Sequence, residues 1–351
     1  MKQNIVNHCG AIAASAACAA WSALLSVGLI ASVSHAQSGS ASQISVSTTA
    51  ADNHAARAAK SVHRHGRLAN TAAAAEAKGT TATINGKSNE SNKNQVRFPG
   101  DLSYQGGAVV TSALSHAIYM NRNGTCTIAS CWGDPEGFLR DLAQSDLIHV
   151  VDQYVGATAS GRYSVGASAM INYVTLGRFD DFDILTQVHA VAQASGQAGV
   201  GHIYHVFLPP GQSVCSANVG CYSPDDPFNF SICGYHGSAD FADIGHVLYT
   251  VEPYQNVSGC QVVSGSVNGA LIDSTNNTLS HELIETITNP DGDAWYNNSL
   301  IALFQSEIGD ECSFFNLSGF FDPPTFRVGR KDYAVQAEYD NTKHACVTKA
   351  D

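Results

Sequence analysis

The sequence predicts an α/β domain with a mixed sheet and packed helices, stabilised by disulfides. Three observations predict this fold class. Strand-like and helix-like segments alternate along most of the chain. An even number of cysteines follows an apolar N-terminal segment of the export type. A helix-period segment near the C-terminal end, "SHELIETITNP", carries histidine and glutamate at metal-ligand spacing.

The N-terminal part divides into two segments that differ from the rest in composition. Residues 1–36 carry a positive charge at Lys2 and continue as an Ala-rich apolar run that ends in Ser34-His35-Ala36, which predicts a signal peptide cleaved near Gln37. An N-terminal membrane anchor is the alternative. Residues 37–96 are rich in Ala, Ser, Thr and Asn, and predict a mostly disordered linker or pro-segment. The globular domain is expected over residues 97–351.

Charge is distributed unevenly and restricts the classes of partner. Residues 1–96 carry more Lys and Arg than Asp and Glu, whereas residues 97–351 are strongly acidic, and the whole chain has a net charge of −12. An acidic domain argues against nucleic acid, whose phosphates need Lys and Arg. Beyond the signal peptide, no stretch is long and apolar enough to span a membrane. An acidic surface is compatible with cation binding.

Cysteines outside the signal peptide form an even set. In an exported chain this set predicts disulfides rather than a thiolate metal site, because no C-x-x-C pair occurs. Close spacing suggests two local pairs, Cys126–Cys131 and Cys215–Cys221, and leaves the other pairings open. The cysteines expected in disulfides are Cys126, Cys131, Cys215, Cys221, Cys233, Cys260, Cys312 and Cys346.

The elements of the domain follow from periodicity and from turn residues. Prolines end one predicted strand, and Gly196 ends one predicted helix. The expected strands cover 106–121, 201–211 and 246–254, and the expected helices cover 134–155 and 181–195.

The segment around H-E-x-x-E predicts a further helix with one buried apolar face, made by Leu279, Leu283, Ile284 and Ile287. Asn289-Pro290 should end it, since the residue before proline disfavours helical geometry.

His281 and Glu285 lie four residues apart in this helix and therefore share a face, where they can grip a metal ion. Glu282 occupies the position of the general base in H-E-x-x-H zinc proteases, which makes this a zincin-like active helix with a glutamate in place of the second histidine. A third ligand must come from elsewhere: Asp310 is favoured and Glu307 is second, because both lie in "EIGDEC".

Several alternatives remain open for this site. Asp291 and Asp293 in "PDGD" are rival ligands. Zinc is the expected ion, and manganese or calcium become alternatives in an oxygen-rich set. The helix is also compatible with an ordinary polar face that binds no metal.

Three further residues are candidates for substrate or ligand contact. His236 lies between glycines in "CGYHG", which reads as a loop, where it would orient substrate or bind metal. A disulfide-stapled turn is the alternative. Trp295 and Tyr296 follow the helix and would line a substrate groove, with core packing as the alternative.

The order of these motifs resembles the phosphate-induced protein 1 family, also called EXORDIUM-like proteins, over roughly residues 100–346. The resemblance rests on "FLRDLAQSDLIHVVDQYV", "HIYHVFLPPGQSVC", "YTVEPYQNVSGC" and "EIGDEC", and most specifically on C-G-x-H-G and T-N-P-x-G-x-x-(W/Y)-Y. It implies a secreted protein of the extracellular space or cell wall. Plant relatives tend to lack H-E-x-x-E, and bacterial-type relatives tend to keep it together with E-I-G-D, as this sequence does.

The sequence therefore predicts a secreted, extracellular or periplasmic, metal-dependent hydrolase. In this interpretation His281, Glu285 and Asp310 hold zinc, and Glu282 activates water to cleave a peptide bond. The alternative is a non-catalytic module that binds cell-wall polysaccharide or a protein partner and contains a structural ion such as calcium. The oligomeric state is not readable from the sequence.

Overall fold

The computed structural model describes residues 100–174, 177–298, 306–313, 323–328 and 330–350, together with the backbone of three short N-terminal strands. The predicted signal-peptide cleavage pattern lies outside the described residues. Two of the N-terminal strands, β2 (Gln43–Val46) and β3 (Ser61–Gly66), fall within the segment 37–96 that is predicted to be mostly disordered. Both belong to the central sheet of the domain.

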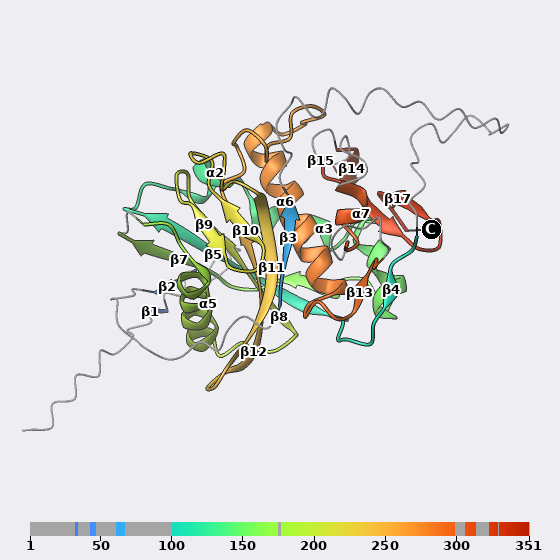
Figure 1. Ribbon diagram of the computed structural model, residues 1–351, viewed down its shortest axis with the longest axis horizontal. Helices are drawn as coiled ribbons and strands as arrows, with labels where there is room; N and C mark the ends of the chain where they lie inside the picture. Colours follow the sequence, from blue (N-terminus) through green and yellow to red (C-terminus); the bar gives the residue numbers. More distant parts are fainter. Residues whose placement is uncertain are drawn as a thin grey trace, which may run out of the picture.

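The domain is built on one mixed nine-stranded sheet (Figure 1). Its strands lie in the order β1-β2-β7-β5-β8-β12-β11-β3, and β6 also pairs with β5. The strands from β2 to β12 are parallel, whereas β11 is antiparallel to both β12 and β3. The remaining bounds are β1 (Ser32–Val33), β5 (Ala113–Arg122), β6 (Tyr163–Val165), β7 (Ser168–Tyr173), β8 (His202–Phe207), β11 (Ile232–Phe241) and β12 (Gly245–Glu252).

Four two-stranded sheets and several helices surround this central sheet. The paired strands are β4 (Ser103–Tyr104) with β13 (Trp295–Tyr296), β9 (Val214–Ser216) with β10 (Gly220–Tyr222), β14 (Thr325–Val328) with β15 (Lys331–Ala334), and β16 (Glu338–Asp340) with β17 (Ala345–Val347). The helices are α2 (Ile128–Cys131), α3 (Pro135–Leu142), the 3-10 helix η2 (Ile148–Val151), α4 (Asp152–Val155), α5 (Asp181–Ser195), α6 (Ala270–Thr288) and α7 (Asp310–Ser313).

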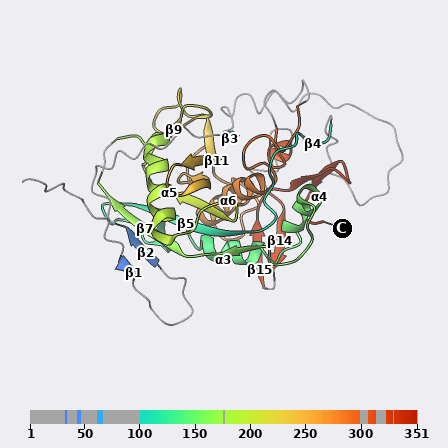
Figure 2. The ribbon, with the colours of Figure 1, turned by 90° about the horizontal axis from the view of Figure 1, so that it is seen from below.

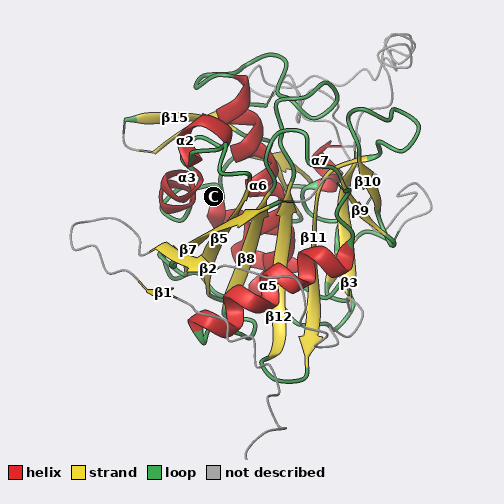
Figure 3. Cartoon of the chain, turned by 90° about the vertical axis from the view of Figure 1, so that its left-hand side faces the viewer, coloured by secondary structure: helices red, strands yellow, loops and turns green. Residues whose placement is uncertain are grey.

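Helices α5 and α6 lie on opposite faces of the sheet (Figure 3). Strand alternation divides the sheet's side chains between two cores. On β8, Ile203 and Phe207 belong to the core on the α6 side, whereas Tyr204 and Val206 belong to the core on the α5 side. The strand predicted over 201–211 is confirmed over residues 202–207, and the helix predicted over 181–195 is confirmed over its whole length.

The helix predicted over 134–155 is wrong in its middle. The structure divides it into α3, η2 and α4. The hydroxyl of Ser145 donates to the carbonyl of Leu142 and accepts from the N–H of Ile148. This local bonding competes with helical hydrogen bonds and produces a turn where the apolar periodicity alone predicted continuity.

Helix α6 is buried on every side over residues 273–288. It lies between the sheet and the C-terminal strands, as the turned view shows (Figure 2). The helix begins at Ala270, so the H-E-x-x-E motif lies in its C-terminal half. Hydroxyl groups of Thr275 and Thr286 donate to carbonyls four residues earlier, which satisfies polar side chains inside a buried helix. Asn289 ends the helix, as predicted.

All eight cysteines of the domain pair at disulfide distance. The two predicted local pairs, Cys126–Cys131 and Cys215–Cys221, are confirmed. The other two pairs flank the buried helix: Cys233 at the start of β11 pairs with Cys260, and Cys312 on α7 pairs with Cys346 on β17. Within the described part of the chain, no helix is long and apolar enough to cross a bilayer.

Candidate metal centre

Three side chains of the α6 motif meet inside the domain. Nε2 of His281 lies 3.1 Å from Oε2 of Glu285, one helical turn later. Glu282 points from the same helix toward β11, where its Oε2 lies 3.4 Å from Nδ1 of His236. All of these side chains are fully buried. The prediction that His281 and Glu285 share a face agrees with this arrangement.

His236 stands on strand β11 and not in a loop, which corrects the sequence interpretation. The glycines around it permit the close packing of the strand against α6 rather than a turn. A Cβ atom on Gly234 would lie 2.6 Å from Oε1 of Glu282 and 2.7 Å from the Thr278 methyl group, so only glycine fits here. The His236 ring consequently reaches the carboxylate of Glu285, with Nδ1 3.6 Å from Oε2.

The segment 306–313 brings two further carboxylates to the helix. Oε1 of Glu307 lies 3.6 Å from Nε2 of His236, and Oδ1 of Asp310 lies 3.9 Å from Nε2 of His281. Gly309 allows this approach, because a Cβ atom on it would lie 2.5 Å from Nδ1 of His281. Its role is therefore close packing.

Hydrogen bonds hold these carboxylates in place. The backbone N–H of Asp310 donates to Oε1 of Glu285 over 3.1 Å, which leaves Oε2 facing the histidines. The side-chain amide of Asn289 donates to Oε1 of Glu307 over 2.6 Å. The Cys312–Cys346 disulfide anchors the segment two residues after Asp310. The carboxylates are thus oriented by the fold.

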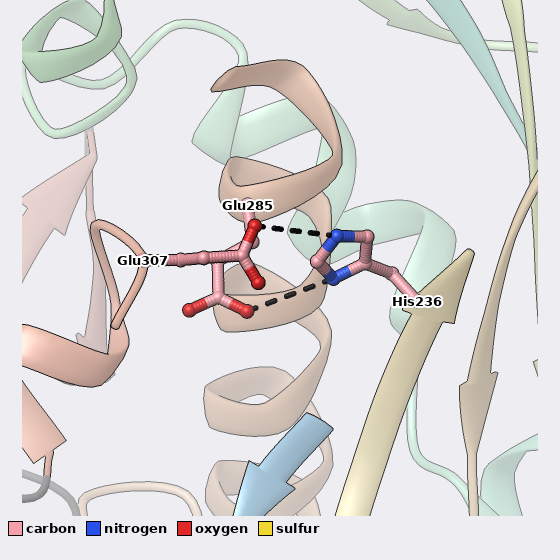
Figure 4. Close-up of side chains that lie close together, drawn as sticks. All are labelled: His236, Glu285 and Glu307. Carbon is pink, nitrogen blue, oxygen red and sulfur yellow. Dashed lines mark ion pairs between the residues drawn. The ribbon is translucent and has the colours of Figure 1, made fainter. Parts of the chain in front are cut away.

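Two groups of three ligand residues result, and they share Glu285. One contains His281, Glu285 and Asp310, and the other contains His236, Glu285 and Glu307 (Figure 4). Two ligands about 2.1 Å from one tetrahedral ion lie about 3.4 Å apart. In the His281 group the nitrogen–oxygen separations are 3.1 and 3.9 Å, which bracket this value. In the His236 group the ligand atoms lie within 4.8 Å of one another, and Glu285 and Glu307 approach opposite nitrogens of the ring. The donor set therefore fits a divalent cation.

Burial dominates the electrostatics of the cluster. It raises the pKa values of Glu282 and Glu285 well above the ordinary glutamate value, and the neighbouring carboxylates add to this effect. Burial is also the main cause that raises the pKa of Asp310, and the nearby Glu285 carboxylate raises it further. Burial lowers the pKa of His281, and the Asp310 carboxylate opposes that shift. The fold thus concentrates carboxyl groups where only a cation or protons can neutralise them.

The structure adds a polar chain that the sequence analysis did not single out. Nδ1 of His205 lies 2.8 Å from the Thr250 hydroxyl, which donates to Oε1 of Glu252 over 2.9 Å. Burial raises the pKa of Glu252 to about 8, and Glu252 in turn raises the pKa of Glu282. Alternation in "HVLYTVE" indicates that Thr250 and Glu252 share a face, which was the available signal.

The other candidate residues lie elsewhere. Asp291 accepts from the hydroxyl of Ser238, 2.6 Å away, and Asp293 lies against Gly107. Neither belongs to the two ligand groups found among the described residues.

Trp295 lies on β13, where its ring packs near those of Tyr104 and Tyr154 and its Nε1 donates to the carbonyl of Tyr154. Tyr296 pairs with Ser103 on β4. A substrate contact at Trp295 or Tyr296 stays a prediction.

Comparisons with known proteins give little further information. No family model matches the chain, and the comparison with curated proteins gives no match. A solved structure described as a chaperone–substrate complex is similar with a TM-score of 0.24 and 11% identity, and the match covers 70% of this chain and 33% of that chain. So low a TM-score carries no argument about fold or function.

Proposed function

We propose that this protein is a metal-dependent hydrolase that cleaves peptide bonds at the α6 cluster. The observation that carries the proposal is the convergence of His281, Glu285 and Asp310 beside the carboxyl group of Glu282. Histidine and carboxylate ligands of this kind suit zinc, with manganese as an alternative. A divalent cation held by these residues would act as a Lewis acid and would lower the pKa of a bound water.

The chain's own residues supply the remaining functions. Glu282 follows His281 in α6 and lies beside His236, and neither of its carboxylate oxygens accepts a hydrogen bond from the described residues. Its carboxylate is therefore available to accept a proton from the attacking water and to pass it to the leaving amine. A cation beside it would favour the ionised form of Glu282, which burial alone disfavours.

An extended peptide is the substrate class that the sheet favours. One edge of β11 pairs with β12, and the other edge pairs with β3. In that antiparallel pairing, His63 lies opposite His236. β3 also lies near α6 (Figure 1). The outer edge of β11 therefore accepts an extended chain segment beside the cluster, in the manner of β-strand addition.

A chelation experiment tests the proposal. The protein is purified from an export host without chelator or affinity tag and assayed on a mixture of unstructured peptides, with mass spectrometry to detect new termini. The proposal predicts cleavage that is lost on dialysis against a chelator and restored by zinc or manganese. Cleavage that persists without metal, or no cleavage by metal-loaded protein with residues 61–66 removed, would contradict it.

A second candidate function is a non-catalytic extracellular module stabilised by its ion. The burial of the ligand set favours it, because His236, His281 and Glu285 are each 0% exposed. In that case the ion would be structural, and calcium would be the alternative to zinc. Removing the metal would then lower the unfolding temperature, and the metal-loaded protein would have no turnover at any peptide concentration.

The proposed setting is extracellular or periplasmic. Four cysteine pairs at disulfide distance support an oxidising compartment. Membership of the EXORDIUM-like family, in the form that keeps H-E-x-x-E, is part of the same proposal and rests on the sequence motifs alone. Sequencing the N-terminus of the exported protein would test the proposed export, with Gln37 as the expected first residue.

A further inference from the structure

We propose that the cluster holds two divalent cations that share Glu285 as a bridging ligand. One cation would be bound by His281, Glu285 and Asp310, and the second by His236, Glu285 and Glu307. The inference rests on the proposed function, since it places a second ion in the same site. It differs from the single-ion site that the sequence predicts, and it gives His236 a ligand role.

The orientation of Glu285 is the first argument. Its Oε1 accepts the backbone N–H of Asp310, so its Oε2 is directed to the histidines. That one oxygen lies 3.1 Å from Nε2 of His281 and 3.6 Å from Nδ1 of His236. The two histidines come from different elements, α6 and β11, and approach the same carboxylate. A carboxylate between two ligand groups is the arrangement in which two ions lie about 3.5–4 Å apart.

Charge is the second argument. Glu282, Glu285, Glu307 and Asp310 are all buried around the two histidines. Among the described residues, Glu282, Glu285 and Asp310 pair with histidines and with no lysine or arginine. One divalent cation would offset two of these four negative charges, and two cations would offset all four, before the neighbouring buried carboxyl groups of Glu252 and Glu338 are counted. An uncompensated buried charge is costly, so the composition of the cluster favours two ions.

The position of Glu282 is the third argument. Both of its oxygens are buried and accept no hydrogen bond within the part of the chain that the structure describes, and its Oε2 lies 3.4 Å from Nδ1 of His236. Glu282 therefore approaches the ligand group of His236. The base of the proposed hydrolysis consequently stands beside the second ion. A single ion at His281 would leave that contact without a catalytic role.

The ligand chemistry restricts the class of ion. Each group offers one imidazole nitrogen and two carboxylates. Calcium favours six to eight oxygen ligands and magnesium favours carboxylates with water, so the imidazoles point to zinc, manganese or a similar transition metal. Two ions of this kind would serve both ends of a hydrolysis reaction, one at the attacking oxygen and the other at the substrate carbonyl.

Titration of the metal-free full-length protein with Mn²⁺ tests the inference. Electron paramagnetic resonance measures both the number of Mn²⁺ ions bound per chain and the spin coupling between adjacent ions. We expect saturation at two equivalents and the signal of a spin-coupled pair. His236→Gln should reduce the number of bound ions to one and abolish the coupling. Glu307→Gln should have the same effect and serves as the test if His236→Gln does not fold. His189→Gln is the matched control, since His189 pairs with Asp243 at the surface.

The outcomes separate this inference from the proposed function. Saturation at one equivalent with an uncoupled signal, lost in His281→Gln and retained in His236→Gln, would overturn the second ion and leave the hydrolase proposal intact. Binding of two ions without spin coupling would contradict the proposal that Glu285 bridges them. Absence of binding would contradict both proposals. Two coupled ions without peptide cleavage would support the metal pair and contradict the hydrolase.

Discussion

Oε2 of Glu285 lies 3.1 Å from Nε2 of His281, and both side chains are fully buried. The i,i+4 spacing places them together, but burial gives the pair its significance. A surface pair of this kind is ordinary and contributes little to stability. Inside the domain the pair faces further carboxylates. The fold must therefore neutralise this charge, and a bound cation is the proposed means.

Replacing Glu282 by glutamine should separate metal binding from hydrolysis. The amide cannot accept the proton of water, so we expect the rate of peptide cleavage to fall by about 100-fold or more while the metal content is unchanged. Glu136→Gln is the control, because Glu136 is buried at the start of α3 and contacts Tyr119. Cleavage at the wild-type rate in Glu282→Gln would remove this residue from the mechanism.

Gly309→Ala should weaken metal binding. The new Cβ atom would lie 2.5 Å from Nδ1 of His281, so the segment that carries Asp310 must move away. Displaced ligand support typically costs about 10–100-fold in metal affinity, which a competition titration with a chromogenic chelator measures. Gly201→Ala is the control, since no atom lies within 4 Å of its Cβ position. Equal affinities in the two variants would contradict the packing argument.

Glu252→Gln should change how stability depends on pH. Burial raises the pKa of Glu252 to about 8 in the folded protein, against 4.5 in the unfolded chain. Between these values only the unfolded chain loses the proton, so wild-type stability should fall as pH rises. Glutamine does not titrate and avoids this loss. The difference in free energy of unfolding between the variant and the wild type should therefore grow in favour of the variant by at most about 1.4 kcal/mol per pH unit.

Denaturant unfolding at pH 4, 6 and 8 in the presence of chelator measures this difference. Below pH 4.5, Glu252 is protonated in both states and contributes no pH dependence. If the free energies of unfolding of the variant and the wild type differ by the same amount at pH 4 and pH 8, Glu252 is ionised in the folded protein at pH 8 and the expectation is wrong. The chelator keeps the metal state constant across the series.

Deleting residues 61–66 should increase cleavage of added peptides. β3 pairs along the outer edge of β11, with His63 opposite His236, and therefore occupies the edge proposed for substrate. An intramolecular strand competes at high effective concentration, so its removal should lower KM more than it raises kcat. Deletion of residues 71–76 is the length-matched control. Unchanged KM after both deletions would place the substrate elsewhere.

Much of the domain was predictable because local signals determine it. Gly196 ends α5 in a left-handed conformation, and Asp180 caps the helix start, so its bounds were readable. The two short-range disulfides followed from spacing. The bend after α3 was missed, because Ser145 bonds locally within an apolar pattern that also fits a continuous helix.

The geometry of the site was readable only on α6, whereas Asp310 and Glu307 were named from their acidic segment without their positions. His281 and Glu285 share a face through helical geometry alone, and this required no tertiary information. His236 was misplaced in a loop because glycine usually signals a turn, whereas Gly234 serves close contact with Glu282. Glu252 was not singled out, since its closeness to the cluster depends on which strand lies beside β11. Strand order is a tertiary property, and it cannot be read from a single sequence by local patterns.

The metal content of the exported protein, measured beside that of His281→Ala, is the decisive test of a metal centre at the α6 cluster. The protein must be purified without chelator or affinity tag and analysed by elemental mass spectrometry. We expect bound zinc or manganese in the wild type and a lower content in the variant. Absence of metal from folded wild-type protein, or the same ion in equal amount in both, would contradict this expectation.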